Sequence, residues 1–370
     1  MKVGDLAIVL PYEVKLRARW NNETRSEDYI GQCGTVTEIM EELCGQPLTP
    51  PQVYVEFGDG FVGSYSPDKL EKYNPLSIDE DYYITPRKGE RRIMDIIGLG
   101  EAGCNIAECF RKYPQYNIYK IDVGVEGDKC FNVPKQKSAE DYESSAPNLS
   151  SFFTELSEEA IFIVGGAGHI SGMTLAILEQ IKDRKISVLY IRPNPKSLTG
   201  KKKLLERATF GILQQYARSA LLEDVHVVSN ENIAKIIGNL PVIGYYDKIN
   251  DLIASTLHFI NVFNRTKHVY GMVEERENVC RISTIGLLDT KTSEEKMFYD
   301  LDLIREKSYF YALNKSTLLN ESNMVSTLES QIEEKKEKWL TKISYRLYST
   351  DYENDFGYCV QRTSKVQGES

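Results

Sequence analysis

The stretch that decides the fold of this chain is GLGEAGCN at residues 98–105, which follows the strand-like run IMDII at 93–97. A second glycine-rich stretch, GGAGHISG at 165–172, follows the apolar run AIFIV at 160–164. Both open into segments with the apolar spacing of a helix. A strand, a glycine-rich turn and a helix N-terminus present outward-pointing N–H groups that an anion can approach closely. Two such loops in one domain indicate a chain of phosphates held between them.

The composition is that of a soluble globular protein, with 370 residues, 41% of them apolar and 27% charged. A net charge of −9 argues against a general nucleic-acid binder. Seven cysteines without CxxC spacing predict reduced thiols and a cytoplasmic location, and four isolated histidines predict no metal site. No run of about 18 apolar residues predicts a membrane span.

Residues 1–75 have short alternating apolar segments separated by turns, with Asp59-Gly60 as a hairpin signal between Val53–Phe57 and Phe61–Tyr65. This order resembles an SH3-like β-barrel, in which Gln46–Pro51 is expected to be a loop. The resemblance implies an unknown protein or peptide partner, and a passive packing module is an equal alternative. Residues 76–90 are predicted to be a linker.

From Arg91 onward strands alternate with helices, which predicts an α/β domain with a parallel sheet and a ligand at the carboxyl ends of its strands. The first loop fits Gly-x-Gly-x-x-Gly, and Asp122 stands where a Rossmann domain places its ribose-binding acid. That interpretation predicts NAD, but it leaves the second glycine loop unexplained.

The tubulin/FtsZ superfamily accounts for both loops. Residues 98–105 resemble its first phosphate loop, and residues 165–172 resemble its Gly-Gly-Gly-Thr-Gly-Thr-Gly signature. The segment RPNPKSLTGKKK at 192–203 is similar to a strand-end Lys/Arg-Pro followed by Glu-Gly-Lys-Lys-Arg in FtsZ. SNENI at 229–233 resembles the base-side segment, and Asn250-Asp251 falls where the central helix supplies Asn-Asp. The resemblance covers residues 91–366.

The resemblance implies a GTP-binding subdomain at 91–245, a central helix with its following loop at 246–272, and a second α+β subdomain at 273–370. It implies GTP or GDP with Mg²⁺ as cofactors, and head-to-tail assembly of identical subunits. The residues that it assigns to the nucleotide are Gly98, Gly100, Glu101, Ala102, Gly103, Cys104, Asn105, Gly165, Gly166, Ala167, Gly168, His169, Ser171, Thr199, Lys203, Asn230, Asn250 and Asp251.

The catalytic loop departs from the family. Members hydrolyse GTP across a subunit interface, with Asp residues of an Asn-x-Asp-x-x-Asp loop polarising the attacking water. Here the corresponding segment reads YGMVEERE at 270–277. Glu274, Glu275 and Glu277 are the candidate catalytic carboxylates, and a solvated acidic turn is the alternative. Glu101 and Ala102 replace glycines, and Glu101 would repel phosphate unless it points away or holds Mg²⁺. This degree of divergence resembles the plasmid- or virus-encoded relatives, TubZ-like proteins and phage tubulins.

The C-terminal part is expected to contain a strand at 281–287, a helix at 293–305, a strand at 308–313 and an amphipathic helix at 323–339. A hairpin of 342–348 with 357–362 is expected to end it.

Three functions follow. The first is a GTP-binding protein that assembles into filaments and is at most a weak GTPase. The second is a non-polymerising scaffold that acts through its N-terminal barrel. The third is a NAD-linked enzyme of the Rossmann type. Guanine binding would depend on Asn105, Asn230 and Asp251, whereas NAD binding would depend on Asp122.

Overall fold

The chain divides into two compact units, residues 1–77 and 78–370, and each is described by itself. The computed structural model describes residues 6–9, 33–43, 46–56, 62–65, 70–72, 94–166, 168–194, 196, 198, 200–238, 244–320, 324–335 and 341–368.

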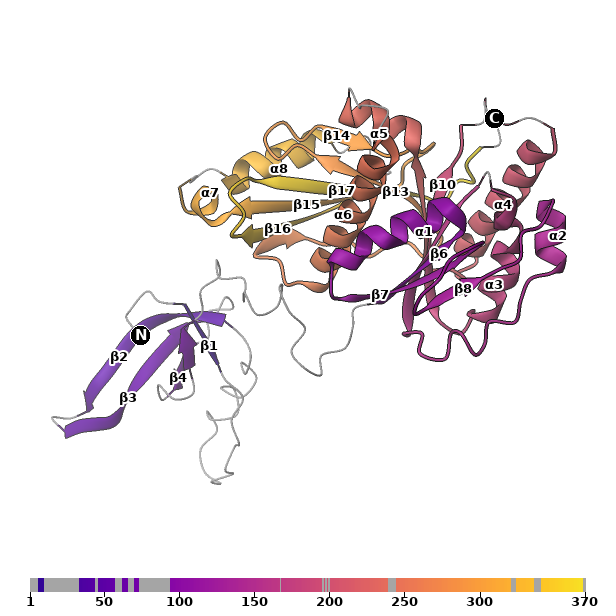
Figure 1. Ribbon diagram of the computed structural model, residues 1–370. Coiled ribbons are helices and arrows are strands. Elements are labelled where there is room, and N and C mark those ends of the chain that lie inside the picture. Colours follow the sequence, from indigo (N-terminus) through magenta and orange to yellow (C-terminus); the bar gives the residue numbers. More distant parts are fainter. Residues whose placement is uncertain are drawn as a thin grey trace. The chain divides into compact units, whose positions relative to one another are not determined.

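The first unit holds a five-stranded antiparallel sheet with the order β4-β3-β2-β1-β5 (Figure 1). Its strands are β1 Leu6–Val9, β2 Cys33–Leu43, β3 Gln46–Glu56, β4 Val62–Tyr65 and β5 Leu70–Lys72. The predicted pairing across Asp59-Gly60 is confirmed, because β3 and β4 pair antiparallel. The loop expected at Gln46–Pro51 is wrong: these residues extend β3 and pair with the end of β2. An SH3-like barrel stays a prediction, because much of this unit lies outside the described residues.

The second unit is built on one large sheet with the order β12-β16-β15-β17-β13-β11-β10-β9-β6-β7-β8, with β14 paired to β13. Its first half is parallel, as the alternation of strands and helices predicts. The strands of this half are β6 Met94–Leu99, β7 Tyr116–Asp122, β8 Cys130–Asn132, β9 Glu159–Gly165, β10 Lys185–Arg192, β11 Asp224–Ser229 and β13 Ile282–Leu288. The other half contains β12 Tyr270–Met272, β14 Glu295–Met297, β15 Glu306–Asn314, β16 Lys342–Thr350 and β17 Phe356–Thr363.

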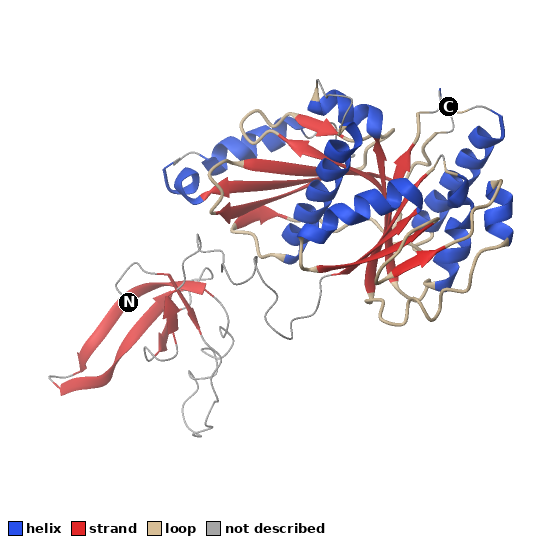
Figure 2. Ribbon diagram, in the orientation of Figure 1, coloured by secondary structure: helices blue, strands red, loops and turns tan. Residues whose placement is uncertain are grey.

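Helices cover both faces of the sheet (Figure 2). One face carries α1 Gly100–Cys109, α5 Asn230–Ile237 and α6 Tyr245–Arg265, and the other carries α2 Ala139–Ser144, α3 Thr174–Gln180 and α4 Gly200–Arg218. Short 3₁₀ turns lie at Phe110–Lys112 (η4) and His169–Met173 (η5). In the second half, α7 Lys315–Asn320 and α8 Met324–Lys335 pack on the face opposite α6. None of the helices in the described part of the chain is long and apolar enough for a transmembrane span.

The helix α6 joins the two halves of the sheet. Its buried side chains, including Ile253 and Leu257, belong to the same core as β6 and β9 of the parallel half. At its other end, Phe263 stacks on Tyr348 of β16 with ring centroids 4.4 Å apart. The Tyr348 hydroxyl donates a hydrogen bond of 2.7 Å to the Phe263 carbonyl oxygen. One helix therefore fixes both halves into a single core.

Two expectations for the C-terminal part are wrong. The segment 293–305 is not a helix: Glu295–Met297 forms β14, which is held by bonds from Lys307 and Tyr309 to the Glu295 carboxylate. The last two strands do not form a hairpin, because β15 lies between them, parallel to β16 and antiparallel to β17. Asn314 at the end of β15 bonds to Asp355 and Tyr352, and so fixes the connection that crosses the strand end.

Two buried histidines make the stability of this unit depend on pH. His226 on β11 lies 2.7 Å from the Ser283 hydroxyl, and His258 on α6 lies 3.1 Å from the Tyr116 hydroxyl. Burial lowers the pKa of both imidazoles from 6.5 to about 4. The folded state therefore keeps them neutral while the unfolded chain takes up protons below pH 6.5.

We expect the free energy of unfolding to fall as the pH drops from 6.5 towards 4, by roughly 3 kcal/mol for each histidine. Urea unfolding across this range measures the slope. His258→Gln removes one titrating group, so the slope should become shallower in that variant. An identical slope in wild type and variant would contradict this account.

Candidate functional site

A cavity of about 510 Å³ opens at the carboxyl ends of the adjacent parallel strands β6, β9, β10 and β11. In an open parallel sheet this edge is where ligands bind. The strand ends and the segments after them line the cavity: Leu99, Gly100, Glu101, Ala102, Gly165, Gly166, Gly168, Ile170, Ile191, Arg192, Pro193, Asn194, Ser229, Asn230, Glu231 and Tyr246. Both glycine loops thus face one space, as their spacing predicts.

The amino ends of two helices point their free N–H groups toward this cavity. α1 begins at Gly100, which has a φ of +70° and so favours glycine, and no side chain caps the helix. α5 begins at Asn230 and also lacks a side-chain cap. Uncapped helix N-termini carry a partial positive charge and unsatisfied donors. The arrangement suits an anionic group.

Three predicted residues of the first loop, Gly98, Gly103 and Cys104, pack against the strands and do not line the cavity. A Cβ atom at Gly98 would lie 2.6 Å from the Gly103 carbonyl oxygen, and one at Gly103 would lie 2.3 Å from the Ile163 carbonyl oxygen. These glycines therefore let α1 pack directly against β6 and β9. The buried Cys104 thiol donates to the Gly98 carbonyl oxygen at 3.3 Å, and burial raises its pKa to about 12. Cys104 is a packing residue in this structure.

A hydrogen bond between two of its own residues stabilises the second loop. The Ser171 hydroxyl is buried and donates a hydrogen bond of 2.6 Å to the Gly168 carbonyl oxygen. Gly166 lies under Tyr190, whose hydroxyl oxygen would be 2.1 Å from an added Cβ. His169 is exposed and does not line the cavity, and Ala167 lies outside the described residues. Gly165, Gly166 and Gly168 of this loop line the cavity together with Ile170.

Polar side chains converge on the same space. The Asn230 Oδ1 atom is buried and has no hydrogen-bond partner within the described structure. Glu101 is exposed at the start of α1. Arg192 forms an ion pair of 3.5 Å with Glu206 and lies over the Phe210 ring. A buried acceptor without a donor is costly, so Asn230 is suited to a ligand N–H group.

The remaining predicted residues lie elsewhere. Asn105 is exposed on α1, Asn250 is buried on α6, and Asp251 forms an ion pair of 2.9 Å with Lys112; none of them lines the cavity. Lys203 lines a neighbouring cavity of about 310 Å³ that shares Arg192. Thr199 lies outside the described residues. Asp122 accepts a hydrogen bond from its neighbour Val123 and does not line the site.

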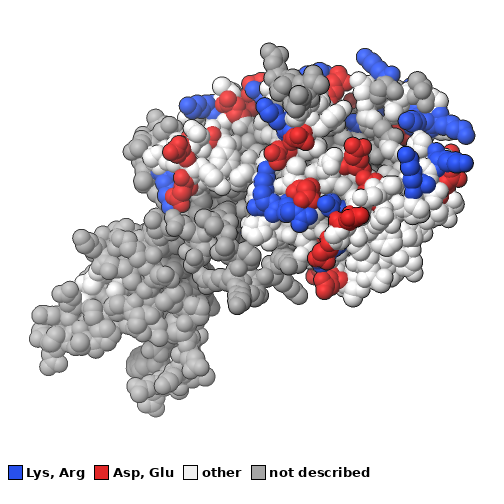
Figure 3. Space-filling model, viewed as in Figure 1, with Lys and Arg blue, Asp and Glu red and all other residues white. Residues whose placement is uncertain are grey.

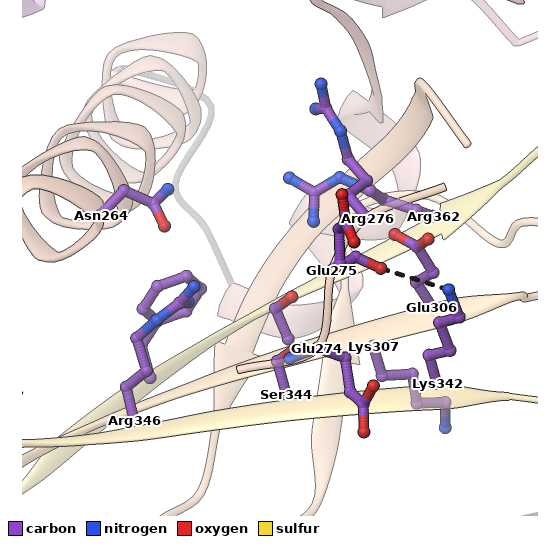
Figure 4. Close-up of a pocket in the computed structure, with 12 residues that line it drawn as sticks. Asn264, Glu274, Glu275, Arg276, Glu306, Lys307, Lys342, Ser344, Arg346 and Arg362 are labelled. Atoms are coloured by element: carbon purple, nitrogen blue, oxygen red, sulfur yellow. Dashed lines mark hydrogen bonds between the residues drawn. The ribbon is translucent and has the colours of Figure 1, made fainter. Parts of the chain in front are cut away.

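The acidic segment 270–277 lies at the other end of α6. Glu274 and Glu275 line a separate cavity of about 190 Å³ together with Asn264, the last-turn residue of the helix (Figure 4). The Glu274 N–H donates to the Ser344 hydroxyl at 2.9 Å. Glu277 does not line the cavity, and its carboxylate pairs with Lys342 at 3.5 Å.

Sequence reasoning missed Arg192, Asn194, Glu231 and Tyr246 as lining residues. A signal existed for the first three, because the segments 192–203 and 229–233 resemble family motifs. Asn194 donates to the Glu231 carboxylate at 2.8 Å, which ties the ends of β10 and β11 together. Tyr246 reaches the site only because α6 packs across it, and no local pattern encodes that contact.

No protein-family model and no curated protein matches this chain. Solved structures do. A GTPγS-form protofilament of TubZ from Bacillus thuringiensis serovar israelensis matches with a TM-score of 0.56 at 15% identity, over 73% of this chain and 87% of that one. GDP-form protofilaments of the same protein match with a TM-score of 0.54 at 15% identity, over 73% and 84%. An FtsZ dimer from M. jannaschii matches with a TM-score of 0.52 at 15% identity, over 74% and 88%. The chain therefore has a tubulin/FtsZ-like fold.

Some glycines of the two loops are required for close packing, whereas others only leave space in the cavity. Substitution by alanine distinguishes the two kinds. Gly103→Ala forces a Cβ to within 2.3 Å of the Ile163 carbonyl oxygen, so we expect the free energy of unfolding to fall by about 1–3 kcal/mol or more. Gly168→Ala is the matched control, because its Cβ would meet only Ile170 at 3.7 Å. It should stay within about 0.5 kcal/mol of wild type in chemical denaturation. Equal stability of the two variants would contradict the packing role of Gly103.

Proposed function

We propose that this protein binds a guanine nucleotide in the cavity at the strand ends and assembles head to tail. The observation that carries the proposal is the convergence of two glycine loops and two uncapped helix N-termini on one cavity. Backbone N–H groups from these elements suit a chain of phosphates. Asn230 supplies a buried acceptor for a donor on the base, such as a guanine N–H. The solved structures with this fold include GTPγS and GDP forms of TubZ.

Glu101 is the candidate ligand for Mg²⁺. It is an exposed carboxylate at the first loop, where it would otherwise repel phosphate. Mg²⁺ is commonly held by one or two carboxylates together with phosphate oxygens and water. The residues present therefore fit a metal that arrives with the nucleotide.

The geometry of α6 supports head-to-tail assembly. Tyr246 at its start lines the strand-end cavity, and Asn264 in its last turn lines the cavity of the acidic segment. A helix of 21 residues is about 30 Å long, so the two cavities lie at opposite ends of one rod. Stacking subunits along this rod would bring unlike ends together, and heterologous contacts of this kind generate open filaments. TubZ protofilaments share the fold.

A scaffold without hydrolysis is the second candidate. Its support is the acidic segment, in which no Asp is present and the Glu277 carboxylate is already paired with Lys342. We do not propose the NAD-linked enzyme, because Asp122 bonds to its own loop and does not line the cavity.

Gly168→Val tests nucleotide binding without disturbing the fold. Gly168 has a φ of −80° and a ψ of 144°, which any residue adopts, and its added side chain would enter the cavity. We expect GTP to bind wild type in isothermal titration and the variant to bind at least about tenfold more weakly, a difference of about 1.4 kcal/mol. Asn230→Ala should reduce the preference for GTP over ATP.

Sedimentation of the same samples measures assembly. Gly168→Ala is the control, because it adds a smaller side chain at the same position. Nucleotide-dependent pelleting in wild type, lost in Gly168→Val, is the expected result. No binding up to millimolar GTP together with no pelleting would exclude the proposal and favour the scaffold.

Turnover depends on the acidic segment. We expect Glu274→Gln or Glu275→Gln to reduce phosphate release per assembled subunit by about tenfold or more, since a general base contributes about 10²–10⁴ in rate. Glu143→Gln, an exposed carboxylate on α2, is the control. Phosphate release is measured in pelleted filaments, so that lost assembly is not mistaken for lost chemistry. Unchanged release in both variants would exclude these carboxylates.

A further inference from the structure

The cavity beyond the end of α6 is an uncovered part of a sheet face. Alternate residues of a strand point to the same side, and Tyr348 of β16 packs under α6. Arg346, Ser344 and Lys342 continue this series past the end of the helix at Arg265, where they line the cavity. Figure 4 shows Asn264 and Arg346 on one side of it, and Arg276 and Arg362 with Glu275 on the other.

Arg346 is a cation without an acid. Its guanidinium lies 5.3 Å from the centre of the Phe310 ring, and no ion pair or hydrogen bond to it occurs within the described part of the chain. Burial lowers its pKa, and Arg362 adds to that effect. The other arginines of the cavity have an acidic partner, because Arg276 bonds to Asp224 at 2.9 Å and Arg362 forms an ion pair with the same carboxylate at 3.5 Å.

Arg346 is the cation of this cavity that has no acidic partner within the described residues. Of the other four cationic side chains that line it, Arg276 and Arg362 pair with Asp224, Lys307 pairs with Glu295, and Lys342 pairs with Glu277. Positive and negative side chains also interleave on the face in Figure 3. Of the three acids that line the cavity, Glu306 accepts a hydrogen bond from the Glu277 N–H, and burial raises the pKa of its carboxyl. Glu274 and Glu275 are exposed and free to turn to solvent.

The size of the cavity limits the ligand. Its volume of about 190 Å³ is less than the roughly 300–1,000 Å³ of sites that enclose a whole small molecule. It accommodates one phosphate group with its bound water, at about 30 Å³ for each water. A guanidinium is the side chain that best matches phosphate, because its planar fork donates two parallel hydrogen bonds.

We propose that this cavity binds a phosphate group, with Arg346 as the principal contact and Asn264 as a second donor. The phosphate is either free in solution or part of the nucleotide held by the next subunit of an assembly. The second source rests on the proposed function, whereas the first does not.

Hydrogen–deuterium exchange of the full chain separates these sources, because it reports on residues 270–281 and 342–350 independently of the two glycine loops. The probes are tripolyphosphate at constant ionic strength, and GTP under assembling and non-assembling conditions. Arg346→Gln should weaken protection of these segments at least about tenfold in ligand concentration, as expected for the loss of a charged hydrogen-bonding partner. Arg346→Lys should retain part of it, and Arg218→Gln, an exposed arginine on α4, should retain all of it.

Protection by tripolyphosphate that is lost in Arg346→Gln supports a free phosphate ligand. Protection only in GTP assemblies, again lost in Arg346→Gln while the assemblies persist, supports the nucleotide of a neighbour. No protection by either probe, or equal protection in Arg346→Gln, overturns the proposal. Failure of GTP to protect the glycine loops would refute the proposed function. The tripolyphosphate result would still decide whether the cavity binds free phosphate.

Discussion

The packing of α6 against both halves of the sheet is the constraint on which the rest of this unit depends. The Phe263 ring stacks on Tyr348 in one half, while Ile253 and Leu257 belong to the core of the other. The two ends of this helix lie far apart, and each borders a different cavity. The packing of one helix therefore positions both candidate sites.

The strand-end cavity shows how glycine serves two separate requirements in one motif. Gly98 and Gly103 are needed because backbone atoms of β6, β9 and α1 approach too closely for a Cβ. Gly168 is under no such constraint, and its contribution is an open wall. A glycine pattern in sequence therefore mixes residues that hold the helix in place with residues that admit a ligand, and only the structure separates them.

Much of the parallel half was predictable, because each strand, glycine loop and helix there is a local pattern. The strands expected at 93–97, 160–164 and 281–287 are confirmed, with small shifts of their ends. The order of the last strands was not predictable, since the insertion of β15 between β16 and β17 depends on pairing between distant segments. The same limit applies to Tyr246 and Arg346, whose neighbours are set by packing and not by spacing. The helix predicted at 293–305 is absent because Glu295 bonds to residues distant in sequence, Tyr309 and Gln361 in the sheet and Lys335 on α8.

The cavity beyond α6 combines two kinds of group with opposite effects on a phosphate. An arginine stabilises negative charge on phosphate oxygens in the bound state and in the transition state of phosphoryl transfer. A carboxylate acts only if it orients a water molecule, and otherwise it repels the ligand. Glu277 is held by Lys342, and Glu306 by a backbone N–H, which leaves Glu274 and Glu275 as the acids free to take that role. The Arg346 guanidinium lies over Phe310 and has no acidic partner within the described residues, whereas Glu274 and Glu275 are exposed. A phosphate that binds here as proposed would therefore meet an unpaired guanidinium whether or not a carboxylate orients water, so binding can persist where turnover is slow.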